Sequence, residues 1–229
     1  MSQTTIISFF KYSGLKNKWN AFGRMGRPPI LKNKIKGLTF FKALGTGSGN
    51  GFSIMPDFST YGFILVFNNE DLAKDFLKND VIKDYTATAS SFSHILMHNI
   101  KSHGKWSNQN PFKSSVEFDK EIPLAVITRA TIKPKLAYQF WKNVPSVSKS
   151  MDNYEELTFS KGIGEFPLLM QATFSVWSSG KAMMDYAYNN PKHAEMIKKT
   201  RELDWYSEEL FARFQPFYQE GDLIPRMIK

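Results

Sequence analysis

A helix-forming stretch, residues 189–214, presents one histidine where it could bind a metal. Asn190 is a good N-cap and Pro191 a good first helical residue, so His193 is expected in the first turn of a helix. The positive end of the helix dipole disfavours imidazolium there, and neutral imidazole is the form that binds metal ions. Because the chain has no cysteine, a soft-metal site in it depends on histidine. The alternative interpretation is an ordinary surface or half-buried helix residue.

Two other histidines, His94 and His98, are four residues apart and share a face whether the segment is a helix or a strand. Such a pair is a possible two-ligand metal clip. No carboxylate lies between them, so the segment is not the H-E-x-x-H motif of zinc proteases. Further ligands are missing from the sequence, which weakens the interpretation as a zinc site.

The glycine-rich segment at residues 45–51 reads G-x-G-x-G-x-G. It lacks the Lys-Ser/Thr ending of a P-loop and does not match G-x-G-x-x-G, which argues against a nucleotide site. Its glycines, Gly47 and Gly49 among them, permit positive φ angles and close approach of the backbone to the edge of a flat ligand. A flexible hairpin loop is the alternative.

Two basic residues, Arg129 and Lys42, lie in segments that otherwise read as apolar strands. An arginine in such a place often faces a cavity or pairs with a carboxylate, so both residues are candidate contacts for an anionic ligand. The commoner alternative is that each belongs to the exposed face of a half-buried strand.

Composition indicates a globular protein of one or two domains. The chain has 229 residues, of which 42% are hydrophobic, and its 20 phenylalanines fit either a Phe-rich core or a large apolar ligand. No apolar run reaches the ~18 residues of a membrane span, and residues 1–10 read as a first strand and not as a signal peptide. With no cysteine for a disulfide framework, these features predict a cytoplasmic protein.

The formal net charge of +9 suits anionic partners, including acidic lipid surfaces and carboxylated cofactors. The basic residues are spread out, and the densest run, residues 31–36, is short. A focused basic patch with interleaved aromatic residues is absent, so we expect no nucleic-acid partner.

The order of apolar segments predicts an α+β fold. Strands are expected at residues 4–12, 38–44, 61–67, 124–132, 157–163 and 169–177, and helices at 15–25, 70–78, 134–150 and 180–188. L-T-F-F-K-A-L-G at 38–45 resembles L-T-F-S-K-G-I-G at 157–164, so each half reads β-α-β-β-α. Two such ferredoxin-like repeats can pack as a dimeric-α/β-barrel-type fold within one chain.

These segments predict four parts of the chain. Residues 1–85 form the first repeat, 86–120 a connecting segment with some structure, 121–214 the second repeat with the His193 helix, and 215–229 a C-terminal tail.

Several motifs occur together in one order: F-K-x-L-G-x-G-x-G-x-G-F (41–52), G-K-W-x-x-x-x-P-F (104–112), T-R-A-T (128–131), F-W-x-x-V-P (140–145) and P-x-H-A-E-x-I (191–197). In this order they resemble the spheroidene monooxygenase family of carotenoid-modifying enzymes. The resemblance implies a haem-containing oxygenase that inserts oxygen into an acyclic carotenoid. It makes His193 the axial haem ligand and places Arg129, Lys42 and Trp106 in shared motifs. We infer that Arg129 and Lys42 contact haem propionates or bound oxygen and take part in catalysis, and that Gly47, Gly49 and Trp106 also contact the haem.

Other functions on the same scaffold stay open at this point: another haem enzyme such as a dehydratase or a peroxidase-like catalyst, a non-enzymatic haem or lipid binder, and a cofactor-free monooxygenase. A membrane-derived carotenoid as substrate implies work at a membrane surface. One chain can form the barrel alone, and a homodimer is also compatible with the sequence. The sequence does not identify the electron donor.

Overall fold

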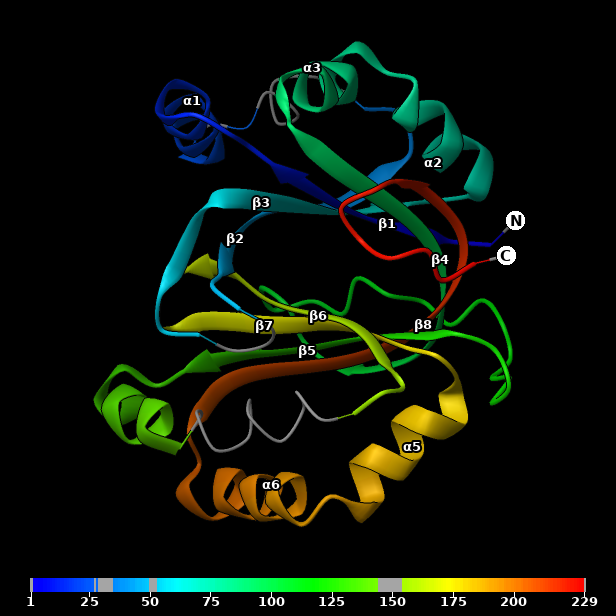
Figure 1. Ribbon diagram of the computed structural model, residues 1–229. Coiled ribbons are helices and arrows are strands. Elements are labelled where there is room, and N and C mark those ends of the chain that lie inside the picture. Colours follow the sequence, from blue (N-terminus) through cyan, green and yellow to red (C-terminus); the bar gives the residue numbers. More distant parts are fainter. Residues whose placement is uncertain (1, 27, 29–34, 50–52, 144–153, 229) are drawn as a thin grey trace.

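The computed structural model describes residues 2–26, 28, 35–49, 53–143 and 154–228, without the side chains of residues 192–194, 196 and 197. The fold is α+β, as expected. Eight strands form a closed barrel in the order β1-β3-β2-β6-β7-β5-β8-β4, and every neighbouring pair given by the register is antiparallel. The helices lie outside the barrel, with α1, α2 and α3 on one side and α5 and α6 on the other (Figure 1).

The first half of the chain supplies four neighbouring strands of the barrel. Its elements are β1 (Thr4–Lys11), α1 (Leu15–Gly26), β2 (Leu38–Gly47), β3 (Pro56–Phe67), α2 (Glu70–Leu77), α3 (Asp80–Thr88) and β4 (Ser91–Gly104). Asn69 caps α2 as expected, because its side chain accepts a hydrogen bond from the backbone N–H of Leu72 at 3.0 Å.

The second half supplies the other four strands. Its elements are β5 (Leu124–Ile132), a 3-10 turn (Pro134–Leu136) that continues as helix over residues 137–143, β6 (Leu157–Phe166), β7 (Met170–Trp177), α5 (Gly180–Asn189), α6 (Pro191–Leu203) and β8 (Tyr206–Gly221). The rest of the helix expected at 134–150 lies outside the described residues. Among the described residues, no helix combines the length and the apolar composition needed to cross a bilayer.

Two strands were missed from the sequence. The segment at 86–120, expected to connect the repeats, contains β4. β8 covers the end of the stretch at 189–214 that was described as helix-forming and continues through residues 215–221 of the predicted tail. These strands pair with each other along eleven residue pairs, from Ser93↔Gly221 to Gly104↔Leu210, and close one seam of the barrel. The other seam, between β2 and β6, has only the pairs Gly45↔Gly164 and Thr46↔Ile163.

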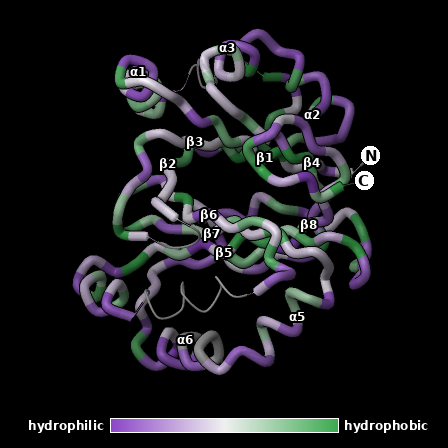
Figure 2. Tube along the Cα trace, in the orientation of Figure 1, coloured by the Kyte–Doolittle hydropathy of each residue, from purple (hydrophilic) through white to green (hydrophobic). Residues whose placement is uncertain are grey.

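Apolar side chains fill the barrel interior. Alternate residues of all eight strands point inward, among them Phe9, Ile64, Phe174 and Phe214, and each is at most 1% exposed. Burial of each such side chain contributes roughly 1.5–3 kcal/mol, so the interior is a stabilising core. Hydrophilic residues concentrate on the outer helices, as Figure 2 shows.

Candidate functional site

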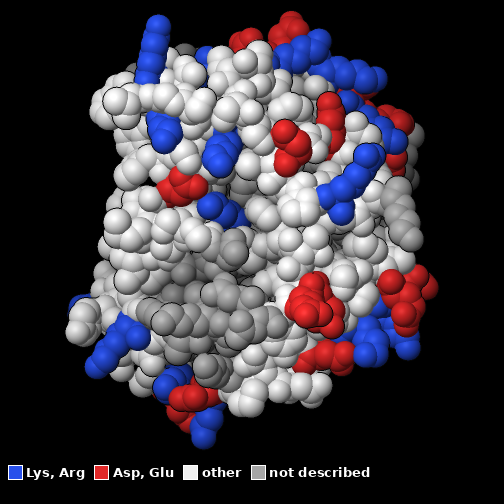
Figure 3. All heavy atoms as spheres, in the orientation of Figure 1, with Lys and Arg blue, Asp and Glu red and all other residues white. Residues whose placement is uncertain are grey.

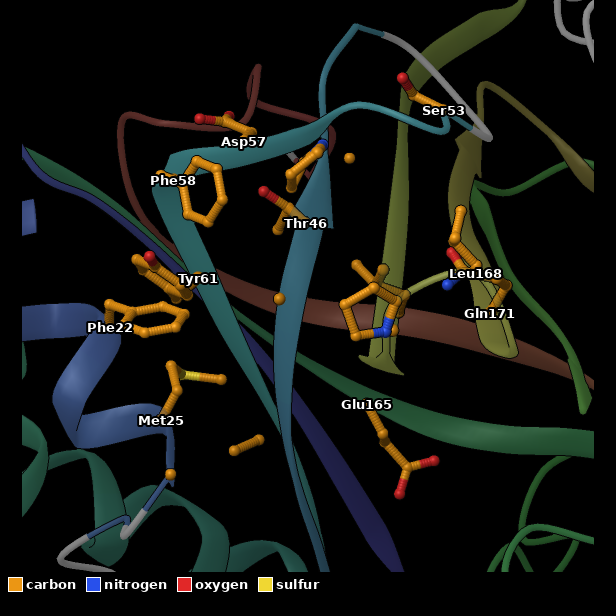
Figure 4. A pocket seen from close by; sticks show the side chains of 18 of the residues that line it. Phe22, Met25, Thr46, Ser53, Asp57, Phe58, Tyr61, Glu165, Leu168 and Gln171 are labelled. Atoms are coloured by element: carbon orange, nitrogen blue, oxygen red, sulfur yellow. The ribbon is translucent and has the colours of Figure 1, made fainter.

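A groove of about 450 Å³ runs over the outside of the barrel where β2 meets β6. Figure 4 shows Phe22, Met25 and Phe58 on one side of β2, with Leu168 and Gln171 on the other. Helix α1 and the start of β3 therefore form one wall, and the β6–β7 hairpin forms the opposite wall. The lining is mainly apolar, which suits a long hydrocarbon ligand.

Glycines form the floor of this groove. Gly45 and Gly164 face each other across the seam, and a Cβ on Gly164 would lie 2.6 Å from the carbonyl oxygen of Met170. The two glycines predicted to contact a ligand separate in the structure. Gly47 lines the groove, whereas Gly49 is exposed, has a positive φ of 72° and lies in the turn that follows β2. Gly49 thus fits the hairpin-loop interpretation.

Three residues predicted from the sequence, Arg129, Lys42 and Trp106, meet at one end of the barrel interior. The Arg129 side chain is 3% exposed and its guanidinium carbon lies 5.6 Å from the centre of the Trp106 ring. Arg129 pairs with Glu208 and, at 3.5 Å, with Glu165. Glu165 also accepts a hydrogen bond from Trp106 Nε1 at 2.6 Å and lies 2.6 Å from Lys42 Nζ. Arg129 therefore does not belong to an exposed strand face.

The two carboxylates of this cluster, Glu165 and Glu208, were not anticipated from the sequence. Burial raises the pKa of Glu208, but hydrogen bonds from the backbone N–H groups of Asn108 and Ser107 and the charge of Arg129 outweigh it, so the pKa is lowered. Glu208 is consequently ionised at neutral pH and ties the loop after β4 to β8. An anionic ligand could reach Arg129 only by displacing a carboxylate that is already there.

Two ion pairs connect the halves of the chain at the β2–β6 seam, and the lysine comes from the first half in one pair and from the second half in the other. Lys161 of β6 lies 3.2 Å from Asp57 of β3, while Lys42 of β2 pairs with Glu165 of β6. Each lysine thus reaches a carboxylate from the other half of the chain. Both carboxylates also line the groove, so the two pairs support the seam beneath it.

The outer face of β6 and β7, next to the groove, has small residues at several positions, while Trp177 at the end of β7 packs against Tyr186 on the same face. Gly162 pairs with Thr173, and Ser160 pairs with Ser175. Thr128 of β5 pairs with Thr173 of β7, and it is exposed although it lies in the middle of its strand. Ser160 is 4% exposed, and its Oγ has no hydrogen-bond partner in the described part of the chain. Buried hydroxyls normally have a partner, so this position is a candidate ligand contact.

The corresponding face of the first half carries large side chains. Phe63 pairs with Ala43 and Ser8, just as Thr173 pairs with Gly162 and Thr128. Phe63 is 1% exposed and belongs to a core that also contains Phe10, Leu65 and Phe67, with Phe41 packed against it. At these matching positions the first half therefore has aromatic side chains and the second half has small ones, whereas Trp177 and Tyr186 form an aromatic cluster elsewhere on the second half.

Helix α6 contains His193 in its first turn, as predicted, and lies outside the barrel (Figure 1). The His193 side chain is outside the described residues, so its role as a ligand stays a prediction. The Arg129 cluster lies on the inner face of the sheet, and α6 lies beyond the outer face. The structure therefore brings Arg129, Lys42 and Trp106 together but keeps them on the other side of the sheet from α6.

The suggested metal clip of His94 and His98 is wrong. Both residues lie on β4, where a separation of four residues spans roughly 13 Å. His94 is buried, and its Nδ1 forms a hydrogen bond with Ser8 Oγ at 2.8 Å. The His98 ring stacks on the Phe217 ring with their centres 4.2 Å apart. Across the described side chains, no group of three or more His, Asp or Glu residues could hold a metal ion.

Three curated relatives match most of this chain, and all are named spheroidene monooxygenase. The protein from Rhodobacter capsulatus is 32% identical over 220 residues, which cover 94% of this chain and 90% of the relative. The protein from Rubrivivax gelatinosus is 33% identical, and the match covers 87% of this chain and 77% of the relative. The protein from Cereibacter sphaeroides is 29% identical, and the match covers 93% of this chain but only 66% of that longer relative. No protein-family model matches the chain.

Solved structures share the fold at low sequence identity. An aldoxime dehydratase superposes with a TM-score of 0.65 at 10% identity, covering 96% of this chain and 84% of the dehydratase. A second aldoxime dehydratase, OxdRE in complex with butyraldoxime, gives a TM-score of 0.63 at 7% identity. At these identities the likeness establishes the barrel architecture and leaves the reaction open.

Proposed function

This chain belongs to the spheroidene monooxygenase family, and on that premise we propose that it is a haem-dependent monooxygenase of an acyclic carotenoid or a similarly long apolar molecule. The observation that carries the haem proposal is the outer face of β6 and β7. Ser160, Gly162 and Thr173 on this face are small where the other half has Phe41, Ala43 and Phe63, the neighbouring Thr128 of β5 is exposed, and the Ser160 hydroxyl has no hydrogen-bond partner among the described residues.

The residues of this face fit a haem group. Haem needs a flat slot, an axial ligand and cationic partners for its propionates. Helix α6, with His193 in its first turn, lies on the same side of the barrel as the floor formed by Ser160, Gly162 and Thr173. When bound, haem would supply the activation of molecular oxygen. His193 would hold the iron, and the small side chains would let the macrocycle approach the sheet.

The groove is the proposed site of the polyene. Gly164 and Gln171, which line the groove, are paired across β6 and β7, and the pair Gly162 and Thr173 follows on the same face. Successive same-face positions of a strand are roughly 7 Å apart, so a chain lying in the groove ends beside the haem floor. The apolar walls of the groove exclude water and orient the reacting carbon atoms.

We assign Arg129 and Lys42 to positioning and not to contact with the haem. Both have carboxylate partners inside the barrel, and Glu165 and Glu208 belong to strands of the half that carries the haem floor. The cluster would therefore fix β6 and β8 relative to β5. Trp106 contributes to the same cluster through its hydrogen bond to Glu165.

We also propose that the chain consists of two ferredoxin-like repeats. Their strands follow the same order, β4-β1-β3-β2 in the first half and β8-β5-β7-β6 in the second. With β4 and β8 included, each unit reads β-α-β-β-α-β. The first unit then extends to Gly104 and the second to Gly221.

Titration of the purified protein with hemin, followed by visible absorption, tests the haem proposal. We expect a Soret band that saturates at one haem per chain and is lost or shifted in His193→Ala. His98→Gln, on the opposite side of the barrel, is the matched control and should titrate like the wild type.

Two results would contradict parts of this proposal. An unchanged spectrum in His193→Ala would remove His193 as the ligand, and a wild type that binds no hemin would point to a cofactor-free oxygenase or an apolar-ligand binder. Incubation with oxygen, a reductant and an acyclic carotenoid separates the reaction types by mass, because an oxygenase product retains an added oxygen atom whereas a dehydratase product loses water.

A further inference from the structure

We propose that the surface around α1 docks onto an anionic lipid bilayer, so that the mouth of the groove opens directly into the membrane. The bilayer as partner is argued from exposed apolar residues and from charge. Only the molecule delivered through the groove rests on the proposed function.

Helix α1 turns its apolar stripe to solvent. Leu15, Trp19 and Phe22 follow the spacing of one helix face, and Leu15 and Trp19 are 89% and 75% exposed. The ring centres of Trp19 and Phe22 lie 6.1 Å apart, and Phe22 lies 6.1 Å from Phe58 of β3. Ala21 is the residue of this helix that is buried against the barrel. The stripe is thus continuous with the wall of the groove.

Exposed apolar residues also border the groove elsewhere. Ile54 and Met55 directly precede β3, and Ile54 lines the groove, while Phe166 and Leu168 are exposed on the β6–β7 hairpin. Scattered exposed apolar residues are ordinary, but a contiguous set around a groove indicates an interaction surface. Both edges of the groove could therefore enter the apolar part of a membrane together.

The positive charge of the protein comes from the same part of the chain. Residues 1–56 contain nine of the 30 Lys and Arg residues and none of the 21 Asp and Glu residues, so the remaining residues carry 21 of each sign. In this part Lys11, Lys16 and Lys36 are exposed, and α1 contains no acidic residue. Figure 3 shows Lys and Arg side chains beside the uncharged surface over α1.

This combination favours a bilayer over a second copy of the chain. A symmetric dimer through this face would bring the same basic residues together, which is unfavourable, whereas anionic headgroups complement them. Each Lys or Arg near such a surface is attracted by the anionic headgroups, and Trp is a preferred residue at the membrane interface. Apolar insertion and basic contacts together give the two signals that stable membrane binding needs.

Vesicle binding tests the docking surface without reference to haem. Wild-type protein should co-sediment with vesicles of phosphatidylcholine and phosphatidylglycerol and bind vesicles of phosphatidylcholine alone less well. Leu15→Gln combined with Trp19→Gln should weaken binding at least tenfold, and Lys16→Gln combined with Lys18→Gln should remove the preference for the anionic vesicles. Tyr188→Gln, an exposed aromatic residue on α5, is the matched control and should bind like the wild type.

Quenching by brominated lipids locates the contact. Trp19 is highly exposed, whereas the other four tryptophans (Trp106, Trp141, Trp177 and Trp205) are at most 6% exposed. Brominated acyl chains should quench wild-type fluorescence, and Trp19→Phe should bind vesicles but lose this quenching. Binding without quenching in the wild type would overturn the proposed orientation.

The remaining outcomes separate this inference from the proposed function. Absence of vesicle binding, with self-association that the Leu15/Trp19 variant abolishes, would make this face a contact between copies and overturn the proposal. Unaltered vesicle binding by that variant would also overturn it. If the wild type turns over a carotenoid, the variant should keep its rate on detergent-dispersed substrate and lose it on substrate embedded in vesicles. If the wild type binds vesicles but shows no turnover, docking stands and the proposed function fails.

Discussion

The two halves of the barrel turn equivalent strand positions outward but fill them differently. The first half places Phe63 where the second has Thr173, and Phe41 where the second has Ser160. Ser8, which pairs with Phe63, is 0% exposed, whereas Thr128, which pairs with Thr173, is exposed. The same backbone thus carries aromatic side chains at these positions in one half and small side chains in the other.

This difference shows how a repeated architecture separates stability from binding. Large-to-small changes in a core cost several kcal/mol when nothing replaces the lost side chain. The second half has small residues at several positions of one face, which is expected if a ligand supplies the missing contacts. The groove is lined by residues of both outer faces, among them Ala43 and Tyr61 of the first half and Gly164 and Gln171 of the second.

The largest expected effect comes from making the second half resemble the first. Thr173→Phe should fill the space over the floor and abolish hemin binding in the absorption titration, because the ring would occupy the volume assigned to the macrocycle. Thr173→Val, which preserves the size of the side chain, is the matched control and should titrate normally. Normal hemin binding by Thr173→Phe would place the haem elsewhere.

The reciprocal change tests the other side of the comparison. Phe63→Thr should lower the free energy of unfolding by about 4 kcal/mol, measured by urea denaturation, since it leaves a cavity under the helices of the first half. It should leave hemin stoichiometry unchanged. A loss below about 1 kcal/mol would mean that the first-half core tolerates the space that we attribute to the second half alone.

A substitution inside the barrel is expected to have an effect of intermediate size on stability. Phe9 on β1 and Arg129 on β5 occupy matching inward positions, opposite Gly62 and Ala172. Arg129→Ala should destabilise the protein by about 3 kcal/mol, because it leaves Glu208 and Glu165 without their buried cation. Urea denaturation of the variant measures this loss.

A paired substitution is the control for Arg129. Arg129→Met combined with Glu208→Leu should cost less stability than Arg129→Ala, because the double variant has no carboxylate at position 208 to be left ionised and unpaired. If Arg129→Ala instead kept the stability of the wild type but no longer bound hemin, Arg129 would be a cofactor contact and not a positioning residue.

The smallest expected effect depends on pH. His94 on β4 and Phe211 on β8 occupy matching outward positions, and burial lowers the pKa of His94 to about 4. The unfolded chain binds a proton near pH 6.5 and the folded chain does not. Stability should therefore fall as pH drops from about 7 to about 5, by about 2 kcal/mol.

Urea denaturation at the two pH values measures this effect, and His94→Gln is the comparison. The variant should lose the part of the pH dependence that His94 contributes. An identical pH dependence in both proteins would mean that folding does not shift the pKa of His94.

The sequence was sufficient for elements whose pattern is local. β5 was predicted with its observed bounds and β1 to within one residue, because each is a short apolar run bounded by turn residues. β4 and β8 were missed because they are rich in polar residues, although each pairs with a strand of its own half, β1 or β5, as well as with the other. The alternation of Leu210, Ala212 and Phe214, all buried, was a period-two signal for β8.

The candidate site was predictable to a similar degree. A lone arginine in an apolar strand drew attention to Arg129, but isolated glutamates such as Glu165 and Glu208 have no local pattern that predicts their contact with it. The small-residue face had a visible signal, because aligning the two halves sets Phe41 against Ser160. The groove depends on a meeting of α1 with the β2–β6 seam, which spacing along the chain does not encode.

The short β2–β6 seam is the weaker of the two places where the halves of the barrel meet. Two residue pairs close it, against eleven on the β4–β8 side, and the Lys42–Glu165 and Lys161–Asp57 pairs bridge it. We expect local opening to begin here, because few backbone hydrogen bonds must break. A thick or bent hydrocarbon could then enter when β2 and β6 separate slightly while β4 and β8 stay paired. The width of the groove would thus adapt to its ligand without unfolding of the barrel.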